Sequence, residues 1–446
     1  MSEPPPDRGM RRARVAAAGT AAVLFAAVGA LLGLTTPWNP LPGHVPGGHT
    51  AADRALDFTP AEIARSKAFD SALNPPAYSG LLVGLAVVLA LGLSPLGARL
   101  IGRAAARVRR RPLRVALAAV TLTTVFRLAG LPFDVWRESV LRRYGLSTQS
   151  WPSWLADQLK SLGVTWVIYT IALLLLYAVI RRFPRYWWAG AAAGGLVLVI
   201  AVSFLYPIAV EPVFNKFHPL PQGRLRSDLL TMAERDGVPV KDVLVADASR
   251  RTTSLNAYVS GFGSTRRIVV YDTLLKSPPA RVESIVAHEL GHAKRDDVLW
   301  GTLVGALGVA GALCLLQLLM TSPWLLRRAG VRAGPGKDGG AADPRSAALL
   351  LALVTVATQV GTPVQNLVSR HIEARADAHA LDLTRDPGVF VSMQHELSVR
   401  NISDLAPNPV EYLLWLTHPA GPARIAMARD WARMHDVPVP PPLRSP

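Results

Sequence analysis

Seven long apolar blocks constrain this chain more than any other feature of its sequence. A helix needs about 20 predominantly apolar residues to cross the hydrocarbon core of a bilayer. The chain holds seven blocks near that length: Val15–Thr36, Ser79–Ala98, Val115–Phe133, Leu162–Ile180, Trp187–Tyr206, Val298–Met320 and Ala347–Pro363. We therefore predict an integral membrane protein with about seven transmembrane helices.

The first and third blocks each carry a feature that allows two interpretations. The basic letters RRAR precede the first block, as they would in a signal peptide. Its apolar core is long and no small-residue cleavage site follows, so we expect an uncleaved helix. Arg127 lies inside the third block, where an ionisable residue marks either a functional site or a side chain that snorkels or pairs with another helix.

Positive charge is concentrated at the ends of the apolar blocks. The chain of 446 residues has a formal net charge of +17, and most of its basic residues are arginines. Charge placed in this way indicates cytoplasmic segments that flank membrane helices, so we expect no nucleic-acid partner. Cys314, the single cysteine, lies inside an apolar block, which excludes intrachain disulfides and metal clusters built from several thiolates.

Two polar regions are too long to be simple loops. The first, Pro207–Asp297, contains a predicted helix around Ser227–Asp236 and strand-like runs at Asp242–Ala246 and Arg267–Tyr271. The second, Leu367–Pro446, has helical periodicity and ends in the letters VPVPPPLRSP, for which we expect disorder. A separate loop with the letters GPGKDGGAADP, within residues 327–345, predicts a flexible link between two helices.

The letters HELGH carry the strongest chemical signal in the chain. On a helix, His288 and His292 lie one turn apart on the same face, so both imidazoles can bind one cation. Glu289 leans towards the same site and can take a proton from metal-bound water. The alternative is a pair of surface histidines on an amphipathic helix. A catalytic zinc needs three protein ligands and one open position, so a third ligand must be found downstream.

Glu373 and Asp377 are the best candidates to complete such a site. They also lie one helical turn apart, so Glu373 can bind the metal while Asp377 accepts the ring N–H of a histidine ligand. Without the upstream motif, the same pair would be read as solvated helix surface. His371 and His379 are rival ligands, but they fall on other faces of the helix that carries Glu373.

The letters HPAGPAR place His418 six residues before Arg424. A proline-rich turn can direct both side chains to the metal, where they would stabilise the oxyanion of a tetrahedral intermediate. A helix-capping turn with a surface arginine fits the same spacing, and the spacing alone does not decide between the two.

These motifs together resemble the type I CAAX prenyl endopeptidase family of membrane zinc metalloproteases and its bacterial homologues. The matching letters are HELGH, NLVSRHIEARAD, LTHPAGPAR, PVFNKFHPL and SLNAYVSGFGSTRRIVVYDTLL. They extend from about Leu131 to Arg424, and the amino-terminal third matches only loosely. HPAGPAR departs from the family by replacing the usual two prolines after the histidine.

The resemblance implies a predominantly α-helical membrane protein with about seven transmembrane helices around a water-filled chamber, and a zincin-like α+β region with a small sheet. It implies one zinc ion per chain, bound by His288, His292 and Glu373, with Glu289 as general base and Asp377 behind a ligand. It further implies that His418 and Arg424 act on the transition state. Asn256, Ala257 and Tyr258 would form an edge strand to which a substrate backbone adds.

We accordingly divide the chain into five regions: a five-helix membrane region (1–206), a zincin-like region with the edge strand and the HELGH helix (207–297), a transmembrane hairpin (298–363), C-terminal catalytic helices with the third ligand (364–436) and a disordered tail (437–446).

The expected function is hydrolysis of membrane-associated or lipid-modified peptides and proteins by a monomeric zinc metalloendopeptidase in a bacterial cytoplasmic membrane. Three alternatives stay open. They are a quality-control metalloprotease of the heat-shock type, an intramembrane site-2-type protease, and a non-catalytic channel or transporter that keeps a structural zinc.

Two arguments disagree about the side of the membrane on which the metal lies. Residues 99–114, between the second and third blocks, hold seven arginines and no acid. Short basic loops stay in the cytoplasm, which places the catalytic region outside after five crossings. The family resemblance implies the cytosolic side instead. We favour the extracytoplasmic interpretation because the charge pattern belongs to this chain.

Overall fold

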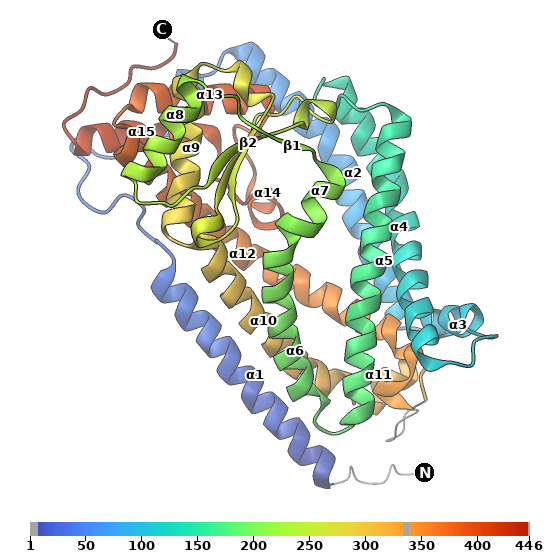
Figure 1. Cartoon of the computed structure of the whole chain (residues 1–446). Helices are drawn as coiled ribbons and strands as arrows, with labels where there is room; N and C mark the ends of the chain where they lie inside the picture. Colours follow the sequence, from blue (N-terminus) through green and yellow to red (C-terminus); the bar gives the residue numbers. More distant parts are fainter. Residues whose placement is uncertain (1–7, 333–338, 445–446) are drawn as a thin grey trace.

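The computed structural model describes residues 8–332 and 339–444, in which a bundle of long helices carries a smaller helix-and-sheet domain at one end (Figure 1). Seven of the described helices are long and apolar enough to cross a membrane. They are α1 (Arg8–Thr35), α2 (Pro60–Gly92), α4 (Arg111–Arg143), α5 (Trp151–Arg182), α6 (Trp187–Leu205), α10 (Asp297–Met320) and α12 (Ala347–Thr384). The predicted seven-helix membrane architecture is therefore confirmed.

The last of these helices joins the membrane bundle to the smaller domain. The block predicted to end at Pro363 continues without interruption to Thr384, and Pro363 stands inside the helix. The predicted region boundary between residues 363 and 364 therefore falls within α12. One continuous helix carries both a membrane span and Glu373.

The second predicted block is interrupted in the structure. α2 ends at Gly92, and Ser94 begins the short helix α3 (Pro95–Ala104) by accepting a hydrogen bond from the Leu96 N–H. Gly92 also lies where α2 packs tightly against α12, since a β-carbon there would lie 2.3 Å from the Cβ of Ala352. A side chain at this position would force the two membrane helices apart.

α6 leads directly into the smaller domain. A π-helical turn (Tyr206–Val210) connects it to the short helix α7 (Glu211–Phe214). The strand β1 (Phe217–Pro219) follows α7 after a short connection.

The sheet has four strands in the order β1-β2-β4-β3. β2 (Asp242–Ala246) and β4 (Arg267–Tyr271) are parallel and occupy the residues predicted for them, whereas β1 and β3 (Ala257–Ser260) run antiparallel to their neighbours. β3 lies at the edge of the sheet and pairs Ala257 with Val270. The predicted helix around residues 227–236 is α8 (Arg224–Arg235).

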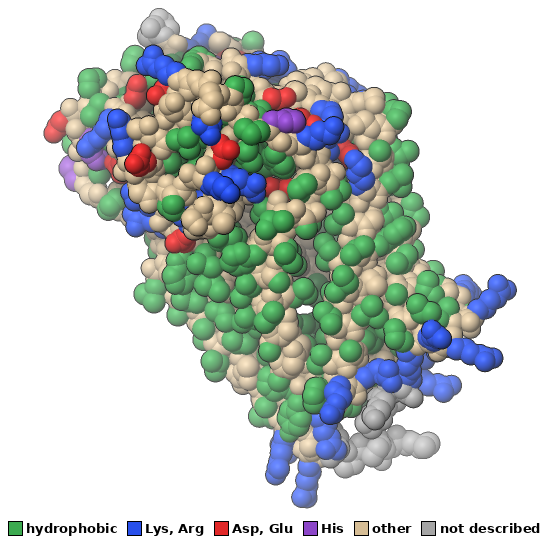
Figure 2. Space-filling view, viewed as in Figure 1, with side chains coloured by type: hydrophobic (Ala, Val, Ile, Leu, Met, Phe, Trp, Pro, Cys, Tyr) green, Lys and Arg blue, Asp and Glu red, His purple; other side chains and the backbone are tan. Residues whose placement is uncertain are grey.

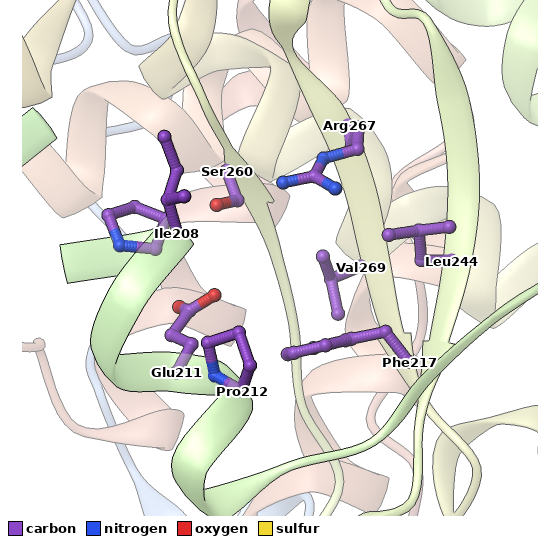
Figure 3. A pocket seen from close by; sticks show the side chains of 9 residues that line it. Ile208, Glu211, Pro212, Phe217, Leu244, Ser260, Arg267 and Val269 are labelled. Atoms are coloured by element: carbon purple, nitrogen blue, oxygen red, sulfur yellow. The ribbon is translucent and has the colours of Figure 1, made fainter. Parts of the chain in front are cut away.

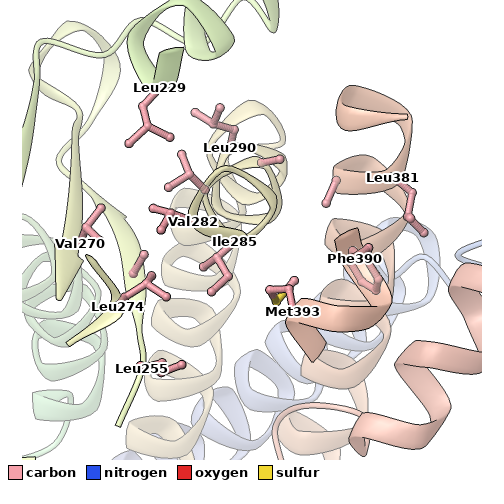
Figure 4. Packing of buried hydrophobic residues seen from close by; sticks show 14 of the residues in the cluster. Leu229, Leu255, Val270, Leu274, Val282, Ile285, Leu290, Leu381, Phe390 and Met393 are labelled. Carbon is pink, nitrogen blue, oxygen red and sulfur yellow. The ribbon is translucent and has the colours of Figure 1, made fainter. Parts of the chain in front are cut away.

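A single apolar core fixes the HELGH helix, α9 (Pro279–Lys294), in the smaller domain. Val270 and Leu229 cover one side of α9, and Phe390 of α13 (Pro387–Arg400) belongs to the same core (Figure 4). Leu290 of α9 is fully buried among them. Each side chain buried in this way contributes roughly 1.5–3 kcal/mol, so the helix is held firmly. The remaining α-helices among the described residues are α11 (Pro323–Arg328), α14 (Pro409–Leu414) and α15 (Gly421–Met434).

The two ends of the bundle differ in charge. On the face shown in Figure 2, apolar side chains cover the helix bundle, the end away from the sheet carries lysine and arginine, and the smaller domain carries basic and acidic side chains together. The start of α1 lies at that end, as do α3 and α11 (Figure 1). The arginine-rich segments of the sequence therefore lie opposite the smaller domain.

Arg127 is paired inside the helix bundle. Its guanidinium donates to the Asp134 carboxylate at 2.7 Å, one to two turns along α4, and it also contacts Gln158 of α5. The ion pair is thus made within α4, and the contact with another helix that one interpretation predicted is the one with Gln158 of α5.

The carboxyl-terminal segment is held in place over its described length. We expected residues 437–446 to be disordered, but Arg429 donates to the carbonyl of Pro440 at 3.1 Å and the N–H of Leu443 donates to Asp57. Residues 445 and 446 lie outside the described residues. Residues 333–338 of the predicted flexible link also lie outside the described residues. The described parts on either side of them include α11 and a 3₁₀ turn at Gly340–Ala342.

Candidate metal centre

The two histidines of HELGH face one another across one turn of α9. Proline occurs only at the start of this helix, so its hydrogen bonding is regular through the motif. The Nε2 atoms of His288 and His292 lie 3.2 Å apart. Gly291 between them packs against the ring of His379, which a β-carbon would approach to 3.0 Å. The glycine of the motif therefore lets α9 lie close to α12.

Glu373 completes the group from α12. Its Oε2 lies 3.1 Å from Nε2 of His288 and 3.6 Å from Nε2 of His292. Ligand atoms that bind one tetrahedral zinc at 2.0–2.1 Å are about 3.4 Å apart. The three predicted ligand atoms therefore have the spacing that a single zinc requires.

The rival histidines are engaged elsewhere. His379 Nε2 lies 2.9 Å from the Asp236 carboxylate, and His371 Nδ1 bonds the carbonyl of Leu367 in its own helix. Neither side chain reaches the group formed by the three predicted ligands.

Carboxylates behind the two imidazoles set their orientation. Asp377 lies 2.8 Å from Nδ1 of His288, as the sequence predicted, and Asp297 lies 2.9 Å from Nδ1 of His292. When Nδ1–H donates to a carboxylate, the lone pair of Nε2 points at the metal. Asp297 was not predicted, although it follows His292 by five residues and is itself paired with Arg375.

The charges around the site favour a cation at its centre. Burial opposes the charged form of His292, but its hydrogen bonds to Asp297 and Glu373 outweigh burial and raise the pKa of its imidazole to about 10. The pKa of His288 is raised in the same way: burial lowers it, and hydrogen bonds to Asp377 and Glu373 more than compensate. A field that stabilises protonated imidazoles also stabilises a divalent cation in their place.

Glu289 lies in the wall of the cavity beside the ligands. Burial raises the pKa of its carboxyl above the ordinary range for glutamate. A carboxylate in that position is suited to exchange a proton with a molecule bound near the metal.

The turn between α14 and α15 brings His418 and Arg424 to different partners. Nε2 of His418 lies 3.1 Å from Oε2 of Glu373, and its side chain is 54% exposed. Nε of Arg424 instead donates to Asp377 at 2.7 Å, and its side chain is 12% exposed. The alternative of a surface arginine is therefore wrong for Arg424, which lies behind His288.

A cavity of about 1040 Å³ connects this group to the helix bundle. His288, Glu289 and His418 line it in the smaller domain, while Asp70 of α2 and Arg137 of α4 line it in the bundle. A space of this size can hold an extended peptide segment.

The edge strand lies beside this cavity. The N–H of Tyr271 donates to the carbonyl of Asn256, so the backbone of Asn256 faces β4 and that of Ala257 faces the free edge. The backbone N–H of Leu255 donates to the side-chain oxygen of Asn401, and the side-chain NH₂ of Asn401 donates to the carbonyl of Leu255. Of the three predicted strand residues, Asn256 lines the cavity, whereas the hydroxyl of Tyr258 is directed to Glu211.

Comparison with known proteins gives two family matches and close relatives. Residues 219–432 match the profile of peptidase family M48, and residues 78–216 match that of the CAAX prenyl protease N-terminal region with five membrane helices. The uncharacterised metalloprotease YhfN of Bacillus subtilis is 30% identical over 424 residues, which cover 93% of this chain and 96% of the relative. The CAAX prenyl protease 1 homologue of Oryza sativa is 28% identical over 322 residues, covering 68% of this chain and 70% of the relative.

The fold is also known. The crystal structure of S. mikatae Ste24p superposes with a TM-score of 0.74 over 93% of this chain and 99% of that chain, at 20% identity. The similarity therefore begins well before Leu131, where the sequence motifs alone placed its start.

Proposed function

This chain is a membrane metalloprotease of peptidase family M48, and on that premise we propose that it hydrolyses peptide bonds at one zinc ion held by His288, His292 and Glu373. The observation that carries the proposal is the spacing of the three ligand atoms, 3.1 to 3.6 Å from one another, with a carboxylate behind each imidazole. A structural zinc would have four protein ligands, whereas three leave a position open for chemistry.

A zinc ion bound there supplies a Lewis acid that polarises the scissile carbonyl and lowers the pKa of water. Glu289 accepts the proton from that water as it attacks the carbonyl carbon, and then returns the proton to the leaving amine. The buried position of Glu289 suits both halves of this transfer because its raised pKa lies closer to neutrality. No covalent bond between the enzyme and the peptide is required.

We assign different roles to His418 and Arg424. The ring of His418 lines the cavity beside Glu373, where it can donate to the oxyanion that develops on the carbonyl. Arg424 is a positioning residue, because its guanidinium holds Asp377 and Asp377 in turn holds His288. This modifies the sequence prediction, which placed both residues on the transition state.

We propose that substrates bind by adding a strand to β3. The backbone of Ala257 faces the free edge of the sheet, and Asn256 lines the adjacent cavity. Strand addition reads the main chain, so it tolerates varied side chains. A relative is named as a CAAX prenyl protease 1 homologue, and the cavity reaches into the membrane bundle. Together these support membrane-associated or lipid-modified peptides as the substrate class.

The alternatives from the sequence fit less well. Membership in a peptidase family favours an enzyme over a channel with a structural zinc. Seven membrane-length helices among the described residues are more than the heat-shock metalloproteases of four helices have. A site-2-type protease has its motif at lipid depth, whereas α9 is packed in the core of the smaller domain.

The charge pattern supports an extracytoplasmic site in a bacterial cytoplasmic membrane. The arginine-rich end of the bundle is opposite the smaller domain (Figure 2), and the positive-inside rule places such an end in the cytoplasm. We propose that a monomer acts in this orientation.

Comparison of wild type with Glu289→Gln tests the proposal. The purified proteins are incubated with a fluorogenic peptide that carries a prenylated cysteine near its C-terminus, and with its unprenylated counterpart. We expect Glu289→Gln to keep its zinc and to lose at least a hundredfold in kcat, because a positioned proton acceptor contributes roughly that much. Equal activity of the two proteins with full zinc content would refute the assignment of the base. Equal cleavage of the two peptides would refute the lipid preference alone.

A further inference from the structure

A second, smaller cavity of about 160 Å³ lies between the outer face of the sheet and the segment that follows α6 (Figure 3). Ile208 and Glu211 line it on the helical side, and Ser260, Arg267 and Val269 line it on the sheet. It shares no lining residue with the large cavity at the metal centre. A polar site here would therefore serve another purpose than binding at the metal.

Three polar side chains line this space, and two of them lack a hydrogen-bond or ion-pair partner among the described residues. The residue Ser260 is 7% exposed, and its hydroxyl has no hydrogen-bond partner among residues 8–332 and 339–444. Arg267 forms no ion pair within the same described ranges, although Glu211 lines the opposite wall. Figure 3 shows the guanidinium and the hydroxyl directed into one space, with the carboxylate of Glu211 across it. The carboxylate has the hydroxyl of Tyr258 as its neighbour.

The charges of Arg267 and Glu211 line this small cavity without forming an ion pair. A ligand that binds between them therefore needs an anionic group for one and a cationic group for the other. Groups that are partly buried need partners, because the loss of hydration is costly when none is supplied. A guanidinium together with a hydroxyl binds an anion with several oxygen atoms, and a carboxylate binds an ammonium. The partner that satisfies all three groups is a small zwitterion.

The position of the cavity indicates where such a zwitterion comes from. It lies at the end of the membrane span that runs from Trp187 to Phe214. The neighbouring surface is apolar and open: Phe204 is 40% exposed, Tyr206 is 49% exposed and Ile208 is 70% exposed. Exposed apolar side chains with a tyrosine at the end of a membrane helix are typical of the depth at which lipid headgroups lie.

We propose that this cavity binds the headgroup of a phospholipid with a primary ammonium, of the phosphatidylethanolamine type. The phosphate oxygens accept hydrogen bonds from Arg267 and Ser260, and the ammonium donates to Glu211. The acyl chains lie along the apolar surface at Ile208. A phosphatidylglycerol headgroup lacks the cation and meets the negative charge of Glu211. A choline headgroup has no N–H to donate.

Thermal unfolding of the full chain in detergent tests the assignment. A ligand that binds only the folded state stabilises it by RT ln(1 + [L]/Kd), so Tm rises with the logarithm of its concentration once that exceeds Kd. The probes are dihexanoyl phosphatidylethanolamine, the matching phosphatidylglycerol and phosphatidylcholine, and free phosphoethanolamine. We expect the first to raise Tm at lower concentration than the other three. Equal responses to the ethanolamine and glycerol lipids would overturn the proposal. An equal response to free phosphoethanolamine would assign the site to a soluble zwitterion and overturn the lipid source.

Variants of the polar residues separate this site from a general detergent effect. Arg267→Gln should abolish the response, and Ser260→Ala should weaken binding about tenfold, as expected for a hydrogen bond to a charged group. Glu211→Gln should remove the preference for ethanolamine over glycerol lipid, because the repulsion of the anionic lipid disappears. Arg224→Gln is the matched control, since Arg224 is 95% exposed on α8.

A conservative variant keeps the test decisive if Arg267→Gln does not fold. Arg267→Lys retains the charge but loses the planar pair of donors, so it should bind the ethanolamine lipid several-fold more weakly than wild type. Native mass spectrometry of the two proteins, released from nanodiscs of mixed lipids, counts the lipid retained on each. Equal retention of the ethanolamine lipid by both proteins would contradict the role of the guanidinium.

Discussion

The Nδ1 atom of His288 lies 2.8 Å from the carboxylate of Asp377, and no solvent reaches that carboxylate. The second oxygen of Asp377 accepts a hydrogen bond from Arg424. The arginine therefore fixes the carboxylate, the carboxylate fixes the imidazole, and the imidazole directs Nε2 towards the position of the proposed zinc. Substitution of any one of these three residues should therefore lower the affinity for zinc, although only His288 is a proposed ligand.

Asp377→Asn should weaken zinc binding by about ten- to a hundredfold, the usual cost of losing a carboxylate behind a histidine ligand. The amide keeps the shape of the side chain but removes its charge. Competition with a zinc chelator measures the affinity. Asp228→Asn, a substitution on the exposed surface of α8, is the control and should bind zinc as wild type does. Unchanged affinity in Asp377→Asn would mean that the imidazole is oriented by its helix alone.

Substitution of His418 should change the kinetic constants alone, whereas substitution of Arg424 should also change the affinity for zinc. His418→Ala should lower kcat and kcat/KM together by roughly a hundredfold and leave zinc affinity unchanged, because the interaction is made only in the transition state. Arg424→Gln should lower zinc affinity as well, because it acts through Asp377. A His418→Ala protein with normal kcat and a raised KM would indicate that this residue binds substrate instead.

The pH dependence of kcat/KM should report the raised pKa of Glu289. Glu289 accepts a proton only when ionised, so activity should fall as the pH drops through its pKa. Burial raises that pKa, and the acidic limb should therefore lie above about 4.3, the value for an ordinary glutamate. Zinc content is measured at each pH, because protonation of the histidine ligands also releases metal. A limb at the ordinary value with zinc fully bound would argue against Glu289 as the base.

Two of the four strands and the paired histidines of HELGH could be predicted from the sequence because their signals are local. Val243 and Val245 in β2, and Ile268 and Val270 in β4, belong to short β-branched runs bounded by polar residues. His288 and His292 share one helical face whatever surrounds them. Residues that act across elements were harder to assign. Asp297 follows HELGH in a run of charged residues that is typical of a membrane edge, and its contact with His292 depends on the start of α10.

Other differences between the sequence predictions and the structure also have physical causes. The apolar block read from the sequence stops at Pro363, but α12 continues through that proline to Thr384, because hydropathy marks the apolar span and not the end of the helix. The cavity at Ser260 and Arg267 depends on which face of the sheet meets α7, and that follows from a strand order that no local pattern reveals. The order of residues 437–444 comes from contacts with Arg429 and Asp57, which are distant in sequence.

Membrane orientation can be tested with a single introduced cysteine. Ser264 is exposed in the turn between β3 and β4, and Cys314 is the only native cysteine. In a Cys314→Ala background, Ser264→Cys should react with a membrane-impermeant maleimide in intact cells if, as we propose, the arginine-rich end of the bundle lies in the cytoplasm. Labelling that appears only after lysis would place the metal centre in the cytoplasm.

The zinc content of three purified proteins tests the central claim most directly. Wild type and His379→Ala should each hold one zinc per chain, since the ring of His379 bonds Asp236 and does not reach the three ligands. Glu373→Ala should lose most of its zinc, because two imidazoles alone bind the metal weakly. Zinc quantified by mass spectrometry on folded, monodisperse protein gives the answer. A full equivalent of zinc in Glu373→Ala would contradict the proposed metal centre.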